Sequence, residues 1–108
     1  MAGKFIIFKG SNEQYYFNLK AGNGERILRS EGYVSKQGCE NGIASVKKHA
    51  PYDTNYDRKT SVNNQYYFNL KALNGEIIGT SETYTTSGGM ENGIQSVKDN
   101  APTAPIED

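Results

Sequence analysis

The chain has 108 residues, of which 35% are hydrophobic and 22% charged, and its twelve basic residues balance its twelve acidic ones. This length suits a single domain, and eight tyrosines and four phenylalanines supply bulky core material that a disordered chain would lack. The zero net charge provides no overall positive field for nucleic acid or anionic lipid, and the longest apolar run, residues 5–8, is too short to span a membrane.

An internal duplication covers most of the chain. Residues 14–51 align with residues 65–102 without a gap, and 25 of the 38 aligned pairs are identical. Half of such a chain buries too little apolar surface to be stable alone, so we expect the two copies to share one core about a pseudo-two-fold axis, as a covalently linked dimer does. We therefore predict a single domain over residues 1–108, made of repeat 1 (about 4–51) and repeat 2 (about 55–102).

Three strands are predicted at the start of each repeat. Residues 5–9 are rich in β-branched and aromatic side chains, which favours a strand. Residues 15–21 alternate, with apolar side chains on one face and polar side chains on the other. The Asn-Gly pair in residues 22–24 favours positive φ in a hairpin turn, and because another strand follows at about 25–30, this loop is no phosphate-binding helix start.

A helix completes each repeat. The apolar residues recur at i, i+4, i+7 and i+11, which is one face of a helix. They are Cys39, Ile43, Val46 and Ala50, and then Met90, Ile94, Val97 and Ala101. Ser35 and Thr86 are the expected N-caps, and Pro51 and Pro102 follow the predicted ends. The result is an α+β fold in which two tandem β-β-β-α repeats share one antiparallel sheet, with both helices packed on one face.

Two segments carry weaker signals. Tyr56–Thr60 aligns with the first strand of repeat 1 but has lost most of its apolar residues, so we predict an edge strand protected by charge. Residues 52–55 are interpreted as the linker between the repeats. Residues 103–108 are interpreted as a disordered tail.

Gly42 and Gly93 fall inside the two predicted helices, where glycine costs about 1 kcal/mol relative to alanine. Three explanations are open: a close approach of helix to sheet, a helix that begins only at Asn41 and Asn92, and a ligand that touches the backbone there. It is also open whether each helix packs on the strands of its own repeat or of the other.

The repeated pattern FNLKAxNGExIxxSExY, followed by ENGIxSVK, resembles the YegP-like family, which comprises small, mostly bacterial proteins of uncharacterised function. The resemblance covers both repeats. It implies two β-β-β-α units in one sheet with the helices on one face, and it implies that relatives with a single unit pair as homodimers. It implies no activity and no catalytic residue.

Few residues suggest catalysis. His49 is the only histidine and is replaced by Asn100 in repeat 2, so we interpret it as a solvent-exposed residue near a helix C-terminus rather than a general base. Cys39 aligns with Met90, which favours a buried core residue over a nucleophile, and a single cysteine fits a cytoplasmic location. One cysteine and one histidine cannot form a zinc site, and we expect no metal and no cofactor.

The polar face of the second strand of each repeat is the candidate binding site. Alternation places an aromatic, an amide and a basic side chain on the outer sheet face of each repeat, in two equivalent patches. These residues are Tyr16, Asn18 and Lys20 in repeat 1 and Tyr67, Asn69 and Lys71 in repeat 2. Some domains bind single-stranded nucleic acid on such faces, but the zero net charge favours a solvated face held by cross-strand pairs, and we expect no nucleic-acid partner.

These observations favour a small non-enzymatic binding or interaction module, which uses the sheet face or the groove between the repeats. Its partner would be an unknown protein or a small ligand, with no membrane involved, and the chain would act as a monomeric pseudo-dimer. The alternatives are an enzyme with two symmetric sites, which turnover on a substrate panel would reveal, and a weak binder of single-stranded nucleic acid through the outer sheet face.

Overall fold

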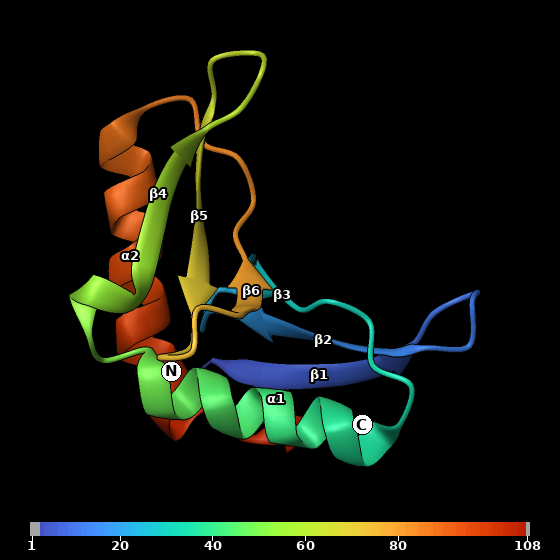
Figure 1. Cartoon of the computed structure of the whole chain (residues 1–108). Helices are drawn as coiled ribbons and strands as arrows, with labels where there is room; N and C mark the ends of the chain where they lie inside the picture. The colour runs from blue at the N-terminus through green and yellow to red at the C-terminus, as the bar shows by residue number, and fades with distance from the viewer. Residues whose placement is uncertain (1–2, 108) are drawn as a thin grey trace.

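The computed structural model describes residues 3–107, and in this part seven strands form one sheet with two long helices on one of its faces (Figure 1). The strands are β1 (Lys4–Lys9), β2 (Tyr15–Lys20), β3 (Arg26–Arg29), β4 (Tyr56–Thr60), β5 (Tyr66–Lys71), β6 (Ile77–Thr80) and β7 (Ile106–Glu107). The helices are α1 (Lys36–His49) and α2 (Ser87–Asn100), and short 3-10 turns follow them at Asp53–Asn55 and Ala101–Thr103. No helix within these residues is long and apolar enough to cross a bilayer.

The two repeats meet at the centre of the sheet, where the strand order is β4-β5-β6-β3-β2-β1-β7. Strands β3 and β6 pair antiparallel through Arg29 and Thr80, which are equivalent residues in the two copies, so the pseudo-two-fold axis passes through this pair. In Figure 1 β4 and β5 of repeat 2 stand upright, whereas β1 and β2 of repeat 1 run across, because the sheet twists strongly. Each helix contacts the central strand of its own repeat and the third strand of the other, so both kinds of helix packing occur.

The predicted alternation of the second strand is confirmed. Phe17 and Leu19 are fully buried, while Tyr16, Asn18 and Lys20 lie on the outer face and are partly exposed. The helix predictions are confirmed as well, because all eight residues of the two apolar stripes lie in one buried core cluster. The capping predictions also hold: the Ser35 and Thr86 hydroxyls accept hydrogen bonds from backbone N–H groups three residues later, at 3.0 and 2.9 Å.

The hairpin glycines have the expected backbone conformation. Gly24 and Gly75 have φ values of +87° and +86°, in the left-handed region that glycine tolerates. The asparagine before each glycine does not share this conformation, because the tight turn is closed one residue earlier, by a hydrogen bond from Gly24 N to the Ala21 carbonyl at 2.9 Å. The Asn23 side chain instead accepts a hydrogen bond from the Glu25 N–H at 3.0 Å.

The C-terminal segment is ordered through Glu107, which corrects the prediction of a disordered tail; Asp108 lies outside the described residues. Ala104 is fully buried, and Phe5 N donates a hydrogen bond to the Pro105 carbonyl at 2.8 Å. Strand β7 pairs parallel with β1, so the sheet is mixed rather than purely antiparallel. The unpaired backbone edge of β1 provides the hydrogen-bond partners that order this short segment.

Strand β4 is an edge strand, as predicted, and it carries three charged side chains. Arg58 occupies the place of Ile7 in repeat 1 and reaches α2, where its guanidinium pairs with the Glu91 carboxylate at 2.6 and 3.0 Å. The same guanidinium contacts Asp53 at 3.0 Å, and Lys98 reaches that carboxylate at 2.8 Å. A charged side chain at this position disfavours pairing of the free edge with another chain.

His49 is buried, with 7% of its surface exposed, so the prediction of a solvent-exposed residue is wrong. Its Nδ1 lies 2.8 Å from the Ser45 carbonyl, and its Nε2 accepts a hydrogen bond from the backbone N–H of Leu73 at 3.3 Å. The hairpin of repeat 2 that contains Leu73 covers the ring. The sequence of helix α1 alone gives no information about that hairpin, so the burial of His49 could not be predicted from it.

The helix glycines are explained by two tyrosines. Helix α1 begins well before Gly42, which excludes a helix that starts at Asn41. A Cβ atom at Gly42 would overlap the hydroxyl of Tyr33, and one at Gly93 would overlap the hydroxyl of Tyr84. The close approach is therefore between helix and tyrosine rather than between helix and strand backbone.

Candidate functional site

A continuous row of side chains crosses the outer face of the sheet. Cross-strand pairing connects Asn18 with Arg29, Arg29 with Thr80, and Thr80 with Asn69. The row therefore runs from β2 through β3 and β6 to β5, and it places one member of each predicted patch on either side of the pseudo-two-fold axis.

The polar groups of repeat 2 satisfy one another on this face. The Thr80 hydroxyl donates a hydrogen bond to the Asn69 side-chain oxygen at 3.0 Å, and Asn69 is buried. The Asp57 carboxylate pairs with Lys71 at 3.2 Å and with Lys59 at 3.3 Å. The Lys71 ammonium, helped by Lys59, holds the pKa of Asp57 below its ordinary value. Two members of the predicted patch of repeat 2, Asn69 and Lys71, are thus already paired with other side chains of the protein.

The equivalent groups of repeat 1 have no such partners. Ile6 stands where repeat 2 has Asp57, and Arg29 stands where it has Thr80. As a result the Asn18, Lys20 and Arg29 side chains make no hydrogen bond or ion pair with another side chain among residues 3–107. The two predicted patches are therefore not equivalent, because residues outside the patches differ between the repeats.

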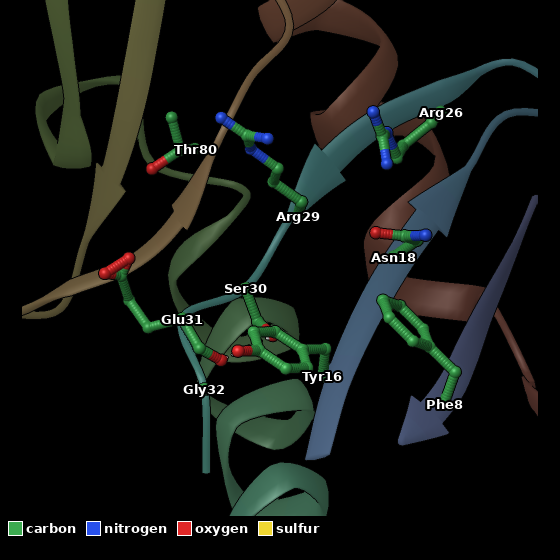
Figure 2. Close-up of a pocket in the computed structure, with 9 residues that line it drawn as sticks. All are labelled: Phe8, Tyr16, Asn18, Arg26, Arg29, Ser30, Glu31, Gly32 and Thr80. Carbon is green, nitrogen blue, oxygen red and sulfur yellow. Dashed lines mark hydrogen bonds between the residues drawn. The ribbon is translucent and has the colours of Figure 1, made fainter. Parts of the chain in front are cut away.

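A hollow of about 450 Å³ lies over the repeat 1 half of this face (Figure 2). Its lining comprises Phe8, Tyr16, Asn18, Arg26, Arg29, Ser30, Glu31, Gly32 and Thr80. It forms where the chain leaves the sheet after β3 and returns at Tyr33, whose backbone pairs with Tyr15. Between these points the Ser30 hydroxyl takes the place of a backbone acceptor and receives a hydrogen bond from Phe17 N at 2.9 Å.

Arg29 is the central cation of the hollow. Figure 2 shows its side chain between Thr80 on one side and Asn18 and Arg26 on the other. The neighbouring Arg26 is engaged with Glu82 of repeat 2, at 2.9 Å. Glu31 also lines the hollow but forms no ion pair with Arg29 among the described residues. The Arg29 guanidinium is thus exposed and available to an incoming group.

One wall of the hollow is aromatic. The rings of Phe8 and Tyr16 stack with centroids 5.6 Å apart and planes inclined by 15°. The Tyr16 hydroxyl accepts a hydrogen bond from the Asn12 amide at 2.9 Å, which holds the ring in place. Sequence reasoning identified Tyr16 and Asn18, together with Lys20, which does not line the hollow. It missed Phe8 and the two arginines, although Arg29 could have been noticed as one of the positions at which the repeats differ.

This architecture defines a class of small duplicated α+β proteins, in which two β-β-β-α repeats form one sheet with the helices on one face. The family model described as "Domain of unknown function (DUF1508)" matches the chain twice, over residues 11–57 and 61–108. The chain belongs to this family.

Several relatives match along nearly their whole length. The UPF0339 protein YegP of Escherichia coli strain K12 is 50% identical over all 108 residues, which cover 98% of that protein. A UPF0339 protein of Bordetella pertussis is 53% identical and covered to 96%. Among solved structures, the solution NMR structure of the E. coli protein has a TM-score of 0.95 at 50% identity, with 100% of this chain and 93% of that chain covered. The NMR structure of a UPF0339 protein from Shewanella oneidensis has a TM-score of 0.93 at 47% identity, with 100% and 92% covered.

Proposed function

We propose that this protein is a small monomeric binding module, and that the hollow over repeat 1 holds the anionic group of a small ligand. One observation carries this proposal. On the outer face of repeat 2 the polar side chains pair with each other, whereas Asn18, Lys20 and Arg29 of repeat 1 are left without side-chain partners in the described part of the chain. Polar groups that are positioned but unpaired are suited to an external partner.

The chemistry of the hollow favours a carboxylate or a phosphate. A guanidinium group is planar and always charged, and it forms two parallel hydrogen bonds to either anion. The Asn18 amide, next to Arg29 across the strands, offers a further donor. The apolar wall formed by Phe8 and Tyr16 would contact a flat apolar part of the same ligand. The volume of about 450 Å³ falls within the range of small-molecule pockets.

A small ligand fits these features better than single-stranded nucleic acid does. Acidic and basic residues cancel over the whole chain, and Lys71 on the other half of the face is neutralised by Asp57. A nucleic-acid strand needs a positively charged track along its backbone, whereas the hollow has two arginines, of which Arg26 is paired with Glu82. The single cysteine, Cys39, is buried and fits the cytoplasmic location that we propose.

The test is an NMR titration of the ¹⁵N-labelled protein with benzoate and with phenyl phosphate, which carry the two anionic groups on one aromatic ring. Arg29→Thr gives repeat 1 the residue that repeat 2 has at this position, so the sheet should tolerate it. Lys59→Thr is the matched control, because it removes one positive charge from the outer face of repeat 2 and leaves the pair between Lys71 and Asp57 in place.

We expect saturable shifts of the amides around Asn18 and Arg29 with at least one probe. Arg29→Thr should weaken binding about tenfold or more, since a hydrogen bond to a charged group contributes about 1.5–3 kcal/mol. Lys59→Thr should leave the affinity unchanged. Equal affinities for the wild type and Arg29→Thr, or no saturable shift with either probe, would contradict the proposal. Tighter binding of a thymidine oligonucleotide to the same residues would show that the hollow binds nucleic acid rather than a small ligand.

A further inference from the structure

A second pocket, of about 260 Å³, lies where the two repeats meet on the helix side of the sheet. The turn between β2 and β3 of repeat 1 forms one side of it, and helix α2 of repeat 2 forms the other. Its lining residues are Ala21, Asn23, Glu25, Ile27, Tyr84, Gly89, Asn92, Gly93 and Ser96. We call it the Tyr84 pocket. It needs both repeats, and it is separate from the hollow on the outer face.

Three polar side chains in this pocket have no internal partner. The Tyr84 hydroxyl, the Glu25 carboxylate and the Asn92 amide make no hydrogen bond or ion pair with any other group among residues 3–107. Glu25 is the only charged residue in the lining. The pocket therefore presents one negative charge and two further oxygen acceptors, with no cation among its lining residues.

The side chain of Tyr84 lies directly against the helix. A Cβ atom at Gly93 would overlap both the hydroxyl and the ring carbon that bears it, so the helix carries glycine, which is a poor helix former. A phenylalanine would supply the same apolar ring to the core cluster without a hydroxyl. Burial, with smaller contributions from Glu82 and Glu25, raises the pKa of Tyr84, so the hydroxyl stays protonated at neutral pH. Since the hydroxyl makes no internal hydrogen bond, core packing does not explain it.

Repeat 1 keeps the same three residue types at the equivalent positions, which are Tyr33, Glu76 and Asn41. Tyr33 again lies against a helix glycine, and burial again raises its pKa, with Glu76 among the contributing carboxylates. One difference separates the two places. Asn41 accepts a hydrogen bond from Gln37 at 3.1 Å, whereas repeat 2 has Gly88 at that position and leaves Asn92 unoccupied.

Other identities between the repeats have structural reasons that these residues lack. Gly24 is needed for its backbone conformation, Phe17 for the core, and Ser30 and Ser45 for hydrogen bonds within the protein. The tyrosine hydroxyl, the glutamate and the asparagine occur in both copies. In the Tyr84 pocket, no hydrogen bond or ion pair within residues 3–107 requires these three polar groups. Each set combines a turn from one repeat with a helix from the other.

From this arrangement we infer that the Tyr84 pocket binds the ammonium group of a small primary amine. An ammonium group has three N–H donors, and the pocket offers three acceptors: the Glu25 carboxylate, the Tyr84 hydroxyl oxygen and the Asn92 side-chain oxygen. The unpaired carboxylate supplies the opposite charge and disfavours an anionic ligand in this pocket. The limited volume favours a small aliphatic amine over a bulky one.

The test is an NMR titration of the full chain with butylamine at neutral pH, with 1-butanol as the uncharged analogue and sodium chloride at equal ionic strength. Glu25→Gln removes the charge and keeps the shape of the side chain. Tyr84→Phe removes one acceptor and leaves the ring in the core. Glu13→Gln is the matched control, because it removes one exposed carboxylate from a different turn.

We expect saturable shifts of the Glu25, Asn92 and Gly93 amides with butylamine alone. Glu25→Gln should weaken binding about tenfold or more, and Tyr84→Phe should weaken it by a smaller factor while the protein stays folded. Glu13→Gln should bind as the wild type does. The inference is wrong if butanol gives the same shifts, if Glu25→Gln binds as tightly as the wild type, or if butylamine gives no saturable shift at these residues.

Discussion

The imidazole of His49 joins the two repeats, because its Nε2 accepts a hydrogen bond from the backbone N–H of Leu73 at 3.3 Å. Since Nε2 is the acceptor, Nδ1 carries the proton and donates to the Ser45 carbonyl at 2.8 Å. In repeat 2 the side chain of Asn100 makes an equivalent pair of hydrogen bonds with different atoms. Its amide donates to the Ser96 carbonyl at 2.8 Å, and its oxygen accepts from Gly3 N at 2.9 Å. Both side chains connect the end of a helix to a segment outside it.

Replacing His49 should therefore affect stability, and the replacement residue should matter. His49→Ala leaves the Ser45 carbonyl and the Leu73 N–H without the imidazole as a partner. We expect the free energy of unfolding to fall by about 1–3 kcal/mol. His49→Asn keeps the donor to the Ser45 carbonyl, as Asn100 does in repeat 2, so it should lose less than half as much. Urea denaturation of the three proteins measures this, and equal stabilities of His49→Ala and the wild type would show that the bridge contributes nothing.

The turn between β1 and β2 contains a residue in an unfavourable conformation. Glu13 has φ +63°, and its counterpart Asn64 has φ +66°. Asparagine tolerates the left-handed region better than glutamate, so Glu13→Asn should raise the free energy of unfolding by about 0.5–1 kcal/mol. The ion pair between Glu13 and Lys9 is exposed and 4.0 Å long, so its loss should cost little. The reverse change, Asn64→Glu, should destabilise by a similar amount, and a neutral result for both would contradict this account.

The charge network beside β4 should make stability depend on acidic pH. Hydrogen bonds from Lys98 and then Arg58 hold the pKa of Asp53 at about 2, below its ordinary 3.8, and Arg58 lowers the pKa of Glu91. A lowered folded-state pKa means that the stabilisation is present above the unfolded pKa, near pH 4, and is lost as the pH falls toward about 2.

We expect a double variant, Asp53→Asn with Glu91→Gln, to lose less stability between about pH 5 and 2 than the wild type does. Thermal unfolding at several pH values measures the difference. Glu31→Gln is the control, because this exposed carboxylate makes no ion pair among residues 3–107, and it should keep the full acid dependence. Parallel pH curves for the wild type and the double variant would show that the network is not stabilising.

Local periodicity was enough to predict the strands and helices that build the core. The alternation around Phe17 and the stripe around Ile43 depend only on residues close in the sequence, and both are buried as expected. Tyr16, Asn18 and Lys20 lie on the outer face of the sheet, as expected, for the same reason. The unequal state of its two halves was not predictable, because it depends on which residue of β1, β4 or β6 lies across the sheet from each member.

The errors concern long-range contacts. Residues 106–107 show no strand pattern, and only the free edge of β1, about a hundred residues earlier, makes them a strand. Burial of His49 depends on Leu73, in a hairpin of the other repeat. Arg29 lines the hollow next to Thr80 because the register of β3 against β6 puts it on the pseudo-two-fold axis, and a single strand does not reveal that register.

The two repeats have become complementary to each other, and this leads to a prediction about separated halves. On the axis Arg29 faces Thr80, and beside it the Leu28 side chain fills the space that Gly79 leaves, since a Cβ at Gly79 would lie 2.6 Å from Leu28. A symmetric dimer of repeat 1 would place Arg29 opposite Arg29 and Leu28 against Leu28, with charge repulsion and overpacking. A symmetric dimer of repeat 2 would leave a void where Leu28 is missing.

Fragments 1–51 and 52–108 should therefore be largely unfolded when separate at micromolar concentration, or form only weak homodimers, and should combine into a folded 1:1 complex when mixed. Each fragment alone exposes apolar residues that the other buries in the shared core. Circular dichroism follows the gain of structure on mixing, and sedimentation gives the stoichiometry. In fragment 1–51 the change Arg29→Thr should favour the homodimer, because it removes the repulsion on the axis. A cooperatively folded monomer of either fragment would show that the repeats do not depend on a shared core.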